Sequence, residues 1–359
     1  MWWSRSLVLS YNKLLNFILS NRGGGKTFDN TRWCIDDYKK NGKQAMWTRR
    51  YDTELYGEKG ILTNGKFFDN VTKVPIKNYP DGKIPKGAKL DPSGQFVNLY
   101  PDDVFEIDGY TGKINGEVAI HFVALSTSRQ LKSANFPLVN KLIFDEFLIG
   151  TESKVGYLKN EVEVLLDLIE TVDRMRDEVR VMCLANSISI VNPYFLYFHI
   201  KPSTAKRFTV YDEICVEMFT DEVFIAKKKQ TRFGRLVSGT RYGDYAIDNK
   251  WLLDNETFIE PKTAKAEFML AMKYQGTYYG FWVDYNVNRI YVTRQYDPSS
   301  YNLYCLTKED HEANLLLIKN LSDQKRVQRI VFAFRNGLIR FEDMQVKNQF
   351  YEFIGFFVR

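Results

Sequence analysis

The sequence predicts an α/β protein, with an N-terminal domain built on a central, mostly parallel sheet and a smaller α+β domain after it. Three observations carry this prediction. Short apolar runs typical of buried strands alternate with helical patterns through the first half of the chain. The length of 359 residues exceeds that of one typical compact domain. From about residue 251 short alternating strands dominate instead.

The composition excludes several classes of protein. Hydrophobic residues make up 45% and charged residues 26%, which argues against a mainly disordered or membrane-spanning chain. The N-terminal apolar stretch is too short for a signal peptide. The formal net charge of +6 permits contact with phosphates without demonstrating it. A zinc site or a disulfide framework is not expected, because the cysteines are widely spaced: Cys34, Cys183, Cys215 and Cys305.

The first predicted elements form a strand–loop–helix–strand unit. The apolar block Leu14–Leu19 is typical of a buried parallel strand, and it runs into a glycine cluster. Residues Thr27–Lys40 have helix-compatible spacing, and Asn41-Gly42 is a suitable C-cap. Gln44–Tyr51 is a plausible second strand. This order is the βαβ unit of a parallel sheet.

An insertion on the core sheet is predicted at about 56–116. Glycine and lysine are frequent there, and short alternating pieces such as Val104–Asp108 indicate hairpins. Five prolines punctuate the stretch: Pro75, Pro80, Pro85, Pro92 and Pro101.

Three further elements complete the predicted N-terminal domain, residues 1–205. Lys141–Phe144 is a buried strand that ends at Asp145 and Glu146. Glu161–Arg176 has the apolar spacing of an amphipathic helix. Val179–Asn186 is another central strand. Residues 206–250 are rich in lysine and arginine and predict a linker or a small helical spacer, with contact to nucleic acid as an equal alternative to simple solvation.

The remaining residues, 251–359, predict the second domain. Phe268–Tyr274, Thr277–Tyr285 and Arg289–Arg294 are expected to be successive strands. Helical patterns follow at Lys308–Lys319 and Lys325–Arg335.

The segment SNRGGGKT, from Ser20 to Thr27, lies between a predicted strand and a predicted helix. Glycines let backbone amides surround phosphates, and the helix N-terminus adds its dipole. Lys26 is expected to neutralise the phosphates, and Thr27 to ligate Mg²⁺. Ser20 departs from the pattern, which places glycine at that position; a glycine-rich turn is the alternative. The candidate nucleotide-binding residues are Asn21, Arg22, Gly23, Gly24, Gly25, Lys26 and Thr27.

The apolar strand that ends in Asp145 and Glu146 has the form of the second Walker motif. Asp145 is expected to hold the Mg²⁺ shell, and Glu146 to act as the general base that polarises the attacking water. A solvated strand end explains such a pair on its own. Together with the glycine loop, it predicts a P-loop ATPase domain of the ASCE/RecA-like type that uses ATP and Mg²⁺.

Three further residues have open interpretations. Asn186 ends a central strand, where its amide could lie beside the γ-phosphate, and a turn-starting asparagine explains it equally well. Arg174 and Arg176 lie near the end of a predicted helix. Either could supply positive charge to a transferring phosphoryl group, but the spacing alone favours a helix C-terminus with stabilising cations.

With the words around them, these motifs resemble the DNA-packaging ATPase of phi29-like bacteriophages. The resemblance runs through nearly the whole chain. The matching stretches are Tyr11–Phe17, Arg22–Thr27, Arg49–Tyr51, Ile143–Phe147, Asn160–Val162, Ser187–Leu196, Lys206–Phe208, Thr231–Leu236 and Trp282–Asp284.

The resemblance implies an ATPase that assembles as a homomeric ring, a pentamer, on the portal of an empty capsid and pumps double-stranded DNA inside. It implies work in the cytoplasm of the infected bacterial host, with no membrane. It places Arg174 at the position of a trans-acting finger and Lys132 at that of a second basic residue near the subunit boundary. It also implies a C-terminal domain resembling a vestigial ribonuclease-H-like nuclease; Asp284 has no obvious metal-binding partners, so we expect no nuclease activity.

Two departures from the family remain. The insertion at 56–116 is longer than the family pattern, and no stretch demonstrates a site for the packaging RNA that some members use. Two other functions stay open: another P-loop helicase or kinase, and a nucleic-acid-binding adaptor whose loop has decayed at Ser20.

Overall fold

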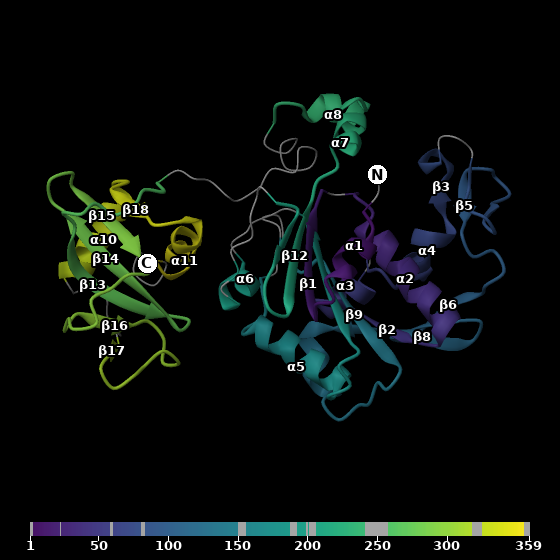
Figure 1. Ribbon diagram of the computed structural model, residues 1–359, viewed down its shortest axis with the longest axis horizontal. Helices are drawn as coiled ribbons and strands as arrows, with labels where there is room; N and C mark the ends of the chain where they lie inside the picture. Colours follow the sequence, from purple (N-terminus) through teal and green to yellow (C-terminus); the bar gives the residue numbers. More distant parts are fainter. Residues whose placement is uncertain are drawn as a thin grey trace. The chain divides into compact units, whose positions relative to one another are not determined.

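The computed structural model divides into two compact units, Met1–Leu252 and Leu253–Arg359 (Figure 1). Within the described ranges, no helix is both long enough and apolar enough to cross a bilayer. All four cysteines are buried and free. The residues described are 3–21, 23–57, 60–79, 83–149, 156–186, 192–198, 200, 206–240, 258–317 and 325–354.

The first unit is built on a nine-stranded sheet in the order β11-β12-β1-β10-β9-β2-β8-β7-β6. The six strands from β12 to β8 pair in parallel, so their carboxyl ends meet at one edge. The outer strands β11, β7 and β6 pair antiparallel. The strands are β1 Leu15–Ser20, β2 Gln44–Arg49, β6 Phe105–Asp108, β7 Thr111–Ile114, β8 Glu117–Ala124, β9 Val139–Asp145, β10 Arg180–Asn186, β11 Phe208–Val210 and β12 Ile214–Phe219.

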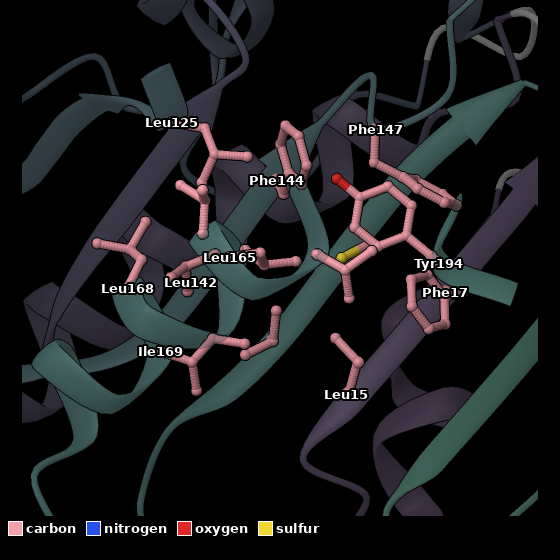
Figure 2. Close-up of a cluster of buried hydrophobic side chains, with 14 of the residues drawn as sticks. Leu15, Phe17, Leu125, Leu142, Phe144, Phe147, Leu165, Leu168, Ile169 and Tyr194 are labelled. Carbon is pink, nitrogen blue, oxygen red and sulfur yellow. The ribbon is translucent and has the colours of Figure 1, made fainter. Parts of the chain in front are cut away.

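Helices cover both faces of this sheet because its central strands are apolar on both sides (Figure 1). Phe17 of β1 packs in the cluster that includes α5 (Glu161–Asp173) and α6 (Pro193–Tyr197), part of which Figure 2 shows. Ile18, the next residue, packs in the cluster that includes α1 (Arg5–Ser10), α2 (Lys26–Asn41) and α4 (Lys66–Thr72). Each such fully buried side chain contributes about 1.5–3 kcal/mol.

The predicted strand–loop–helix–strand unit is present as β1, α2 and β2. Gly42 ends α2 in the left-handed conformation, at φ 67°, and its N–H donates to the carbonyl of Tyr38. The predicted helix Glu161–Arg176 ends earlier, at Asp173, because Arg174 adopts the left-handed conformation at φ 44°.

The linker predicted at 206–250 is wrong for residues 208–219, and residues 241–250 lie outside the described ranges. Residues Phe208–Val210 and Ile214–Phe219 form β11 and β12, and β12 pairs directly with β1. The helical-spacer part of the prediction holds for the short helices α7 (Glu222–Lys229) and α8 (Arg232–Val237). The strand β12 was missed because its buried Glu217 interrupts the apolar pattern. That carboxylate accepts hydrogen bonds from Trp3 and Arg207, which a local reading of the sequence cannot foresee.

The predicted insertion begins where α3 (Asp52–Tyr56) ends, and it contains α4 and two single-turn 3₁₀ helices, Thr63–Gly65 and Ile76–Asn78. The hairpin expected at Val104–Asp108 is confirmed, because β6 and β7 pair antiparallel and continue into β8. The insertion is thus joined to the main sheet. It also holds a small separate sheet of β3 (Val74–Pro75), β4 (Lys89–Leu90) and β5 (Phe96–Asn98).

The second unit confirms the expected α+β arrangement. Its sheet has the order β17-β16-β13-β14-β15-β18 and is covered by α10 (Lys325–Arg335), as predicted, and by α11 (Met344–Ile354). The three predicted strands are present as β13 Glu267–Tyr274, β14 Thr277–Asp284 and β15 Arg289–Thr293. The same sheet also contains β16 Leu303–Cys305, β17 Leu316–Leu317 and β18 Ile339–Phe341.

The helix predicted at Lys308–Lys319 is wrong over the described residues. A turn forms instead, in which Thr307 and Asp310 hydrogen-bond to each other, and Leu316–Leu317 pairs with β16. Such local side-chain hydrogen bonds compete with a helix.

Candidate nucleotide-binding site

Three neighbouring strands end together at one point of the sheet. Ser20 of β1 pairs in register with Asn186 of β10, and Leu184 of β10 pairs with Asp145 of β9. The strand β10 therefore lies between the strand that enters the glycine loop and the strand that ends in the carboxylates. This arrangement brings the two predicted motifs to the same edge, where open α/β sheets bind ligands.

The glycine loop between β1 and α2 has a backbone that only glycine adopts readily. Gly23 has φ 85° and Gly25 has φ 94°, both in the left-handed region. Gly25 is also the N-cap of α2 and provides no side-chain cap. The N-terminal amides of a 16-residue helix therefore face the loop, which favours an anion there. Arg22 lies outside the described residues.

Lys26 is buried at the centre of this loop, with 7% of its surface exposed. Its Nζ donates to the hydroxyl of Ser20 at 2.6 Å and to the carbonyls of Ser20 and Asn21, each at 3.3 Å. Burial lowers the pKa of Lys26 to about 8, against the opposite effect of Asp145 and Glu146. Ser20 therefore has a defined role, because its hydroxyl holds the lysine.

The carboxylates at the end of β9 face the loop and Arg49, the last residue of β2. Thr27 Oγ1 donates to Asp145 Oδ1 at 3.5 Å, and Arg49 Nη2 lies 2.7 Å from Asp145 Oδ2. Arg49 Nη1 lies 2.6 Å from Glu146, whose side chain is 62% exposed. Burial raises the pKa of Asp145 above its ordinary value, although Arg49 acts in the opposite direction.

The donor set fits Mg²⁺. A hydroxyl and a buried carboxylate oxygen lie side by side at Thr27 and Asp145, and Mg²⁺ prefers such hard oxygen ligands. Groups of three or more metal-ligating side chains are absent from the described part of the chain. A Mg²⁺ ion bound with a nucleotide does not require such a group, because phosphates and water supply its other ligands.

The candidate arginines lie at the opposite edge of the sheet. Arg176 donates to the carbonyl of Val139, the first residue of β9, at 2.7 Å, whereas Asp145 is the last residue of that strand. Seven residues of strand separate the two edges by about 20 Å. Arg174 Nη2 donates to the carbonyls of Lys132 and Ala134, at 3.2 and 2.6 Å. Neither arginine can reach the glycine loop of its own chain.

Arg174 and Arg176 differ in what they bind. The guanidinium of Arg176 also donates to the carbonyls of Asp173, Pro137 and Val172, so it fastens the end of α5 to the start of β9. Arg174 is exposed and lies beside Lys132, whose Nζ pairs with Asp167 at 3.1 Å. The geometry therefore favours Arg174 over Arg176 as a group available to another molecule.

Two contributions to the site were missed by sequence reasoning. The sequence around Arg49 fits a strand-end contact to phosphate or DNA and an exposed basic edge equally well, yet the side chain bridges both carboxylates; its place at the end of a parallel strand is the available signal. The N-terminal segment also covers the loop, because the backbone N–H of Trp3 donates to the carbonyl of Gly24 at 3.0 Å. In the second unit, Asp284 accepts hydrogen bonds from Thr263 and from the backbone of Asn286, which gives it a local structural role.

Comparisons with known proteins give matches that cover nearly the whole chain. Residues 1–75 and 93–357 match the family described as podovirus DNA encapsidation protein (Gp16). The DNA packaging protein of Bacillus phage phi29 is 34% identical over 345 residues, which cover 96% of this chain and 94% of that protein. The DNA packaging protein of Bacillus phage B103 is 33% identical, with 96% and 98% covered. Among solved structures, a chain of the bacteriophage phi29 viral genome packaging motor assembly is 33% identical, with a TM-score of 0.75 and 99% and 98% covered.

Proposed function

This chain belongs to the podovirus DNA encapsidation protein family, and from that premise we propose that it hydrolyses ATP to move double-stranded viral DNA into a preformed capsid. The observation that carries the ATPase part is the convergence of the glycine loop and the two carboxylates on strands β1 and β9, with β10 between them. This convergence provides a phosphate cradle and a general base at one edge of the sheet.

In this proposal the amides at the start of α2 and the ammonium of Lys26 bind the β- and γ-phosphates. Glu146 orients a water molecule and takes its proton as the oxygen attacks the γ-phosphorus. The bond from that phosphorus to the bridging oxygen breaks, so that ADP and inorganic phosphate leave. We assign to Asn186 the role of sensing the γ-phosphate with its amide, because it ends the strand between the two motifs.

Thr27 and Asp145 would hold Mg²⁺, which supplies neutralisation of the phosphate oxygens when it is bound. Asp145 suits this role because its Oδ1 faces Thr27 while Arg49 pairs with Oδ2. Without a nucleotide, Arg49 balances the charge of both carboxylates.

We assign the missing positive charge to Arg174 of a neighbouring copy in a homomeric ring, a pentamer by family resemblance. The support is geometric: Arg174 is exposed at the edge of the sheet opposite its own loop, and so is Lys132. A ring arranged head to tail places that edge of one copy against the loop of the next. The ring would work in the cytoplasm of the infected bacterial host, at the portal of the capsid; no described feature identifies a packaging-RNA site.

The adaptor alternative, which Ser20 motivated, is not favoured, because Ser20 is the hydrogen-bond partner of Lys26 rather than a sign of decay. The test of the proposed function is the ATPase rate with and without double-stranded DNA. A rate stimulated by DNA supports the motor. Phosphoryl transfer to a small acceptor without DNA would indicate a kinase, and failure to bind nucleotide would indicate the adaptor.

A further inference from the structure

A buried ionic cluster contacts the backbone of Glu146, the proposed base. Arg50 and Glu161 are 2% and 3% exposed, and Tyr194 is fully buried. The guanidinium of Arg50 pairs with the carboxylate of Glu161 through Nε at 2.8 Å and Nη2 at 3.0 Å. The hydroxyl of Tyr194 donates to the same carboxylate. The residue that follows β2 and the helices α5 and α6 therefore meet at one carboxylate.

The same guanidinium also holds the backbone that follows β9. Arg50 Nη1 donates to the carbonyl of Glu146 at 3.3 Å, and Nη2 donates to the carbonyl of Phe147 at 2.5 Å. The N–H of Phe147 donates to the carbonyl of Leu184 in β10 at 3.1 Å. The peptide groups on both sides of Phe147 are therefore fixed to neighbouring strands.

Fixing this backbone matters because Glu146 has an unusual conformation. Its φ of 61° is in the left-handed region, which is unfavourable for a residue other than glycine. Its side chain is 62% exposed, so packing does little to aim the carboxylate. The direction of the Cα–Cβ bond then depends on the backbone that Arg50 holds, while the carboxylate at the end of the side chain pairs with Arg49.

The cluster is rigid because aromatic rings surround it. The ring of Tyr194 packs against Phe17, Phe144 and Phe147, with centroids 5.9, 6.3 and 5.3 Å away (Figure 2). The guanidinium of Arg50 lies 5.6 Å from the ring of Phe144 and 5.0 Å from that of Tyr157. Such packing restricts both side chains to one geometry.

We infer that Arg50 is a positioning residue for the Glu146 base, with Glu161 and Tyr194 as its supports. This inference rests on the proposed function. Arg50 holds the left-handed backbone at Glu146, so that the carboxylate faces the site of the attacking water. The glycine loop follows β1, whereas Arg50 follows β2, and these strands are not neighbours in the sheet. Loss of this cluster therefore changes the chemical step and leaves ATP binding in place.

A matched buried ion pair exists elsewhere in the same unit. Lys141 of β9 is fully buried, and its Nζ lies 2.6 Å from Asp37 of α2. It also joins a helix to the sheet, but it lies near the start of β9, away from Glu146. Lys141→Met removes this pair and keeps a side chain of similar length, which controls for the loss of a buried ion pair as such.

The experiment measures kcat and KM for DNA-stimulated ATP hydrolysis, together with the thermal unfolding midpoint, in the full chain. Arg50→Lys keeps the charge but loses the fork that reaches one carboxylate and two carbonyls, so we expect kcat to fall at least about tenfold with KM changed by less than about twofold. Tyr194→Phe removes one hydroxyl and is expected to lower kcat about threefold. Lys141→Met is expected to lower the unfolding midpoint while kcat stays within about twofold of wild type.

A wild-type kcat in Arg50→Lys would overturn the inference. Parallel losses of kcat and unfolding midpoint in Arg50→Lys and Lys141→Met would also overturn it, because they indicate a purely structural role. If Arg50→Lys does not fold, Tyr194→Phe decides: a lowered kcat with unchanged KM supports positioning, and an unchanged kcat contradicts it. Absence of ATP hydrolysis in the wild type would instead count against the proposed function itself.

Discussion

The ammonium of Lys26 lies 2.6 Å from the hydroxyl of Ser20, the residue at the first position of the same loop. The hydroxyl occupies the space beside the loop, since a side chain at Gly24 would begin 3.1 Å from it. Serine at this position therefore provides a hydrogen-bond acceptor for a buried charge, which glycine could not provide. The departure from the usual pattern is thus part of how this loop holds its lysine.

The first prediction concerns the pH dependence of ATP binding. The pKa of Lys26 without nucleotide is lowered to about 8, and bound phosphates raise it. Affinity is therefore full below pH 8 and is lost as the pH rises above 8, by up to about tenfold per pH unit. Equilibrium binding of ATP between about pH 6 and pH 9.5 measures this. Affinity that stays constant up to pH 9.5 would contradict the assignment of Lys26.

The second prediction concerns the base. Glu146→Gln keeps the size of the side chain but cannot accept a proton, so we expect ATP binding to remain and kcat to fall about 10²- to 10⁴-fold. Glu163→Gln is the matched control, because Glu163 is an exposed glutamate of α5. Single-turnover hydrolysis and ATP binding are measured for both variants. Unchanged hydrolysis in Glu146→Gln would remove Glu146 from the mechanism.

The third prediction separates the two arginines. Arg176 donates to four carbonyls, so Arg176→Ala is expected to destabilise the first unit by several kcal/mol. Arg174→Ala removes two bonds at an exposed position and is expected to change stability by less than about 1 kcal/mol. Its kcat should nevertheless fall by about 10³-fold or more. Thermal unfolding and ATPase rates give both numbers. The opposite pattern would identify Arg176 as the finger.

The glycine loop and the Asp145-Glu146 pair could be predicted from the sequence because both depend on local patterns. An apolar strand followed by glycines and a helix start specifies the loop, and an apolar strand followed by two carboxylates specifies the other half of the site. Parallel strands then bring the two together. Ser20 pairs in register with Asn186, so the strand that ends at Asn186 lies next to the strand that enters the loop.

The remaining features depend on contacts between distant residues. Glu217 makes β12 look unlike a buried strand, and its partner Trp3 is 214 residues away. Arg49 reaches a carboxylate 96 residues later in the chain. Spacing along the sequence contains no information on such pairs. For the same reason the roles of Arg174 and Lys132 stay a proposal that rests on the family resemblance and on their place at the opposite edge of the sheet.

The fourth prediction concerns the N-terminal segment. Trp3→Phe keeps the buried ring but removes the indole N–H that donates to Glu217, a fully buried carboxylate. We expect the first unit to lose about 1–3 kcal/mol of stability, which lowers its unfolding midpoint by about 2–10 °C. Trp282→Phe is the control, because that indole donates to a carbonyl at an exposed site. Equal midpoints in the two variants would contradict this role of Trp3.

The central claim, that one subunit supplies the base and its neighbour supplies Arg174, is tested most directly by mixing two inactive variants. In a ring, an Arg174→Ala subunit retains Glu146, and a Glu146→Gln neighbour retains Arg174. An equal mixture should therefore regain roughly a quarter of the wild-type ATPase rate if sites act independently, because that fraction of interfaces combines both intact groups. No recovery at any ratio, in rings whose assembly has been verified, would contradict the claim.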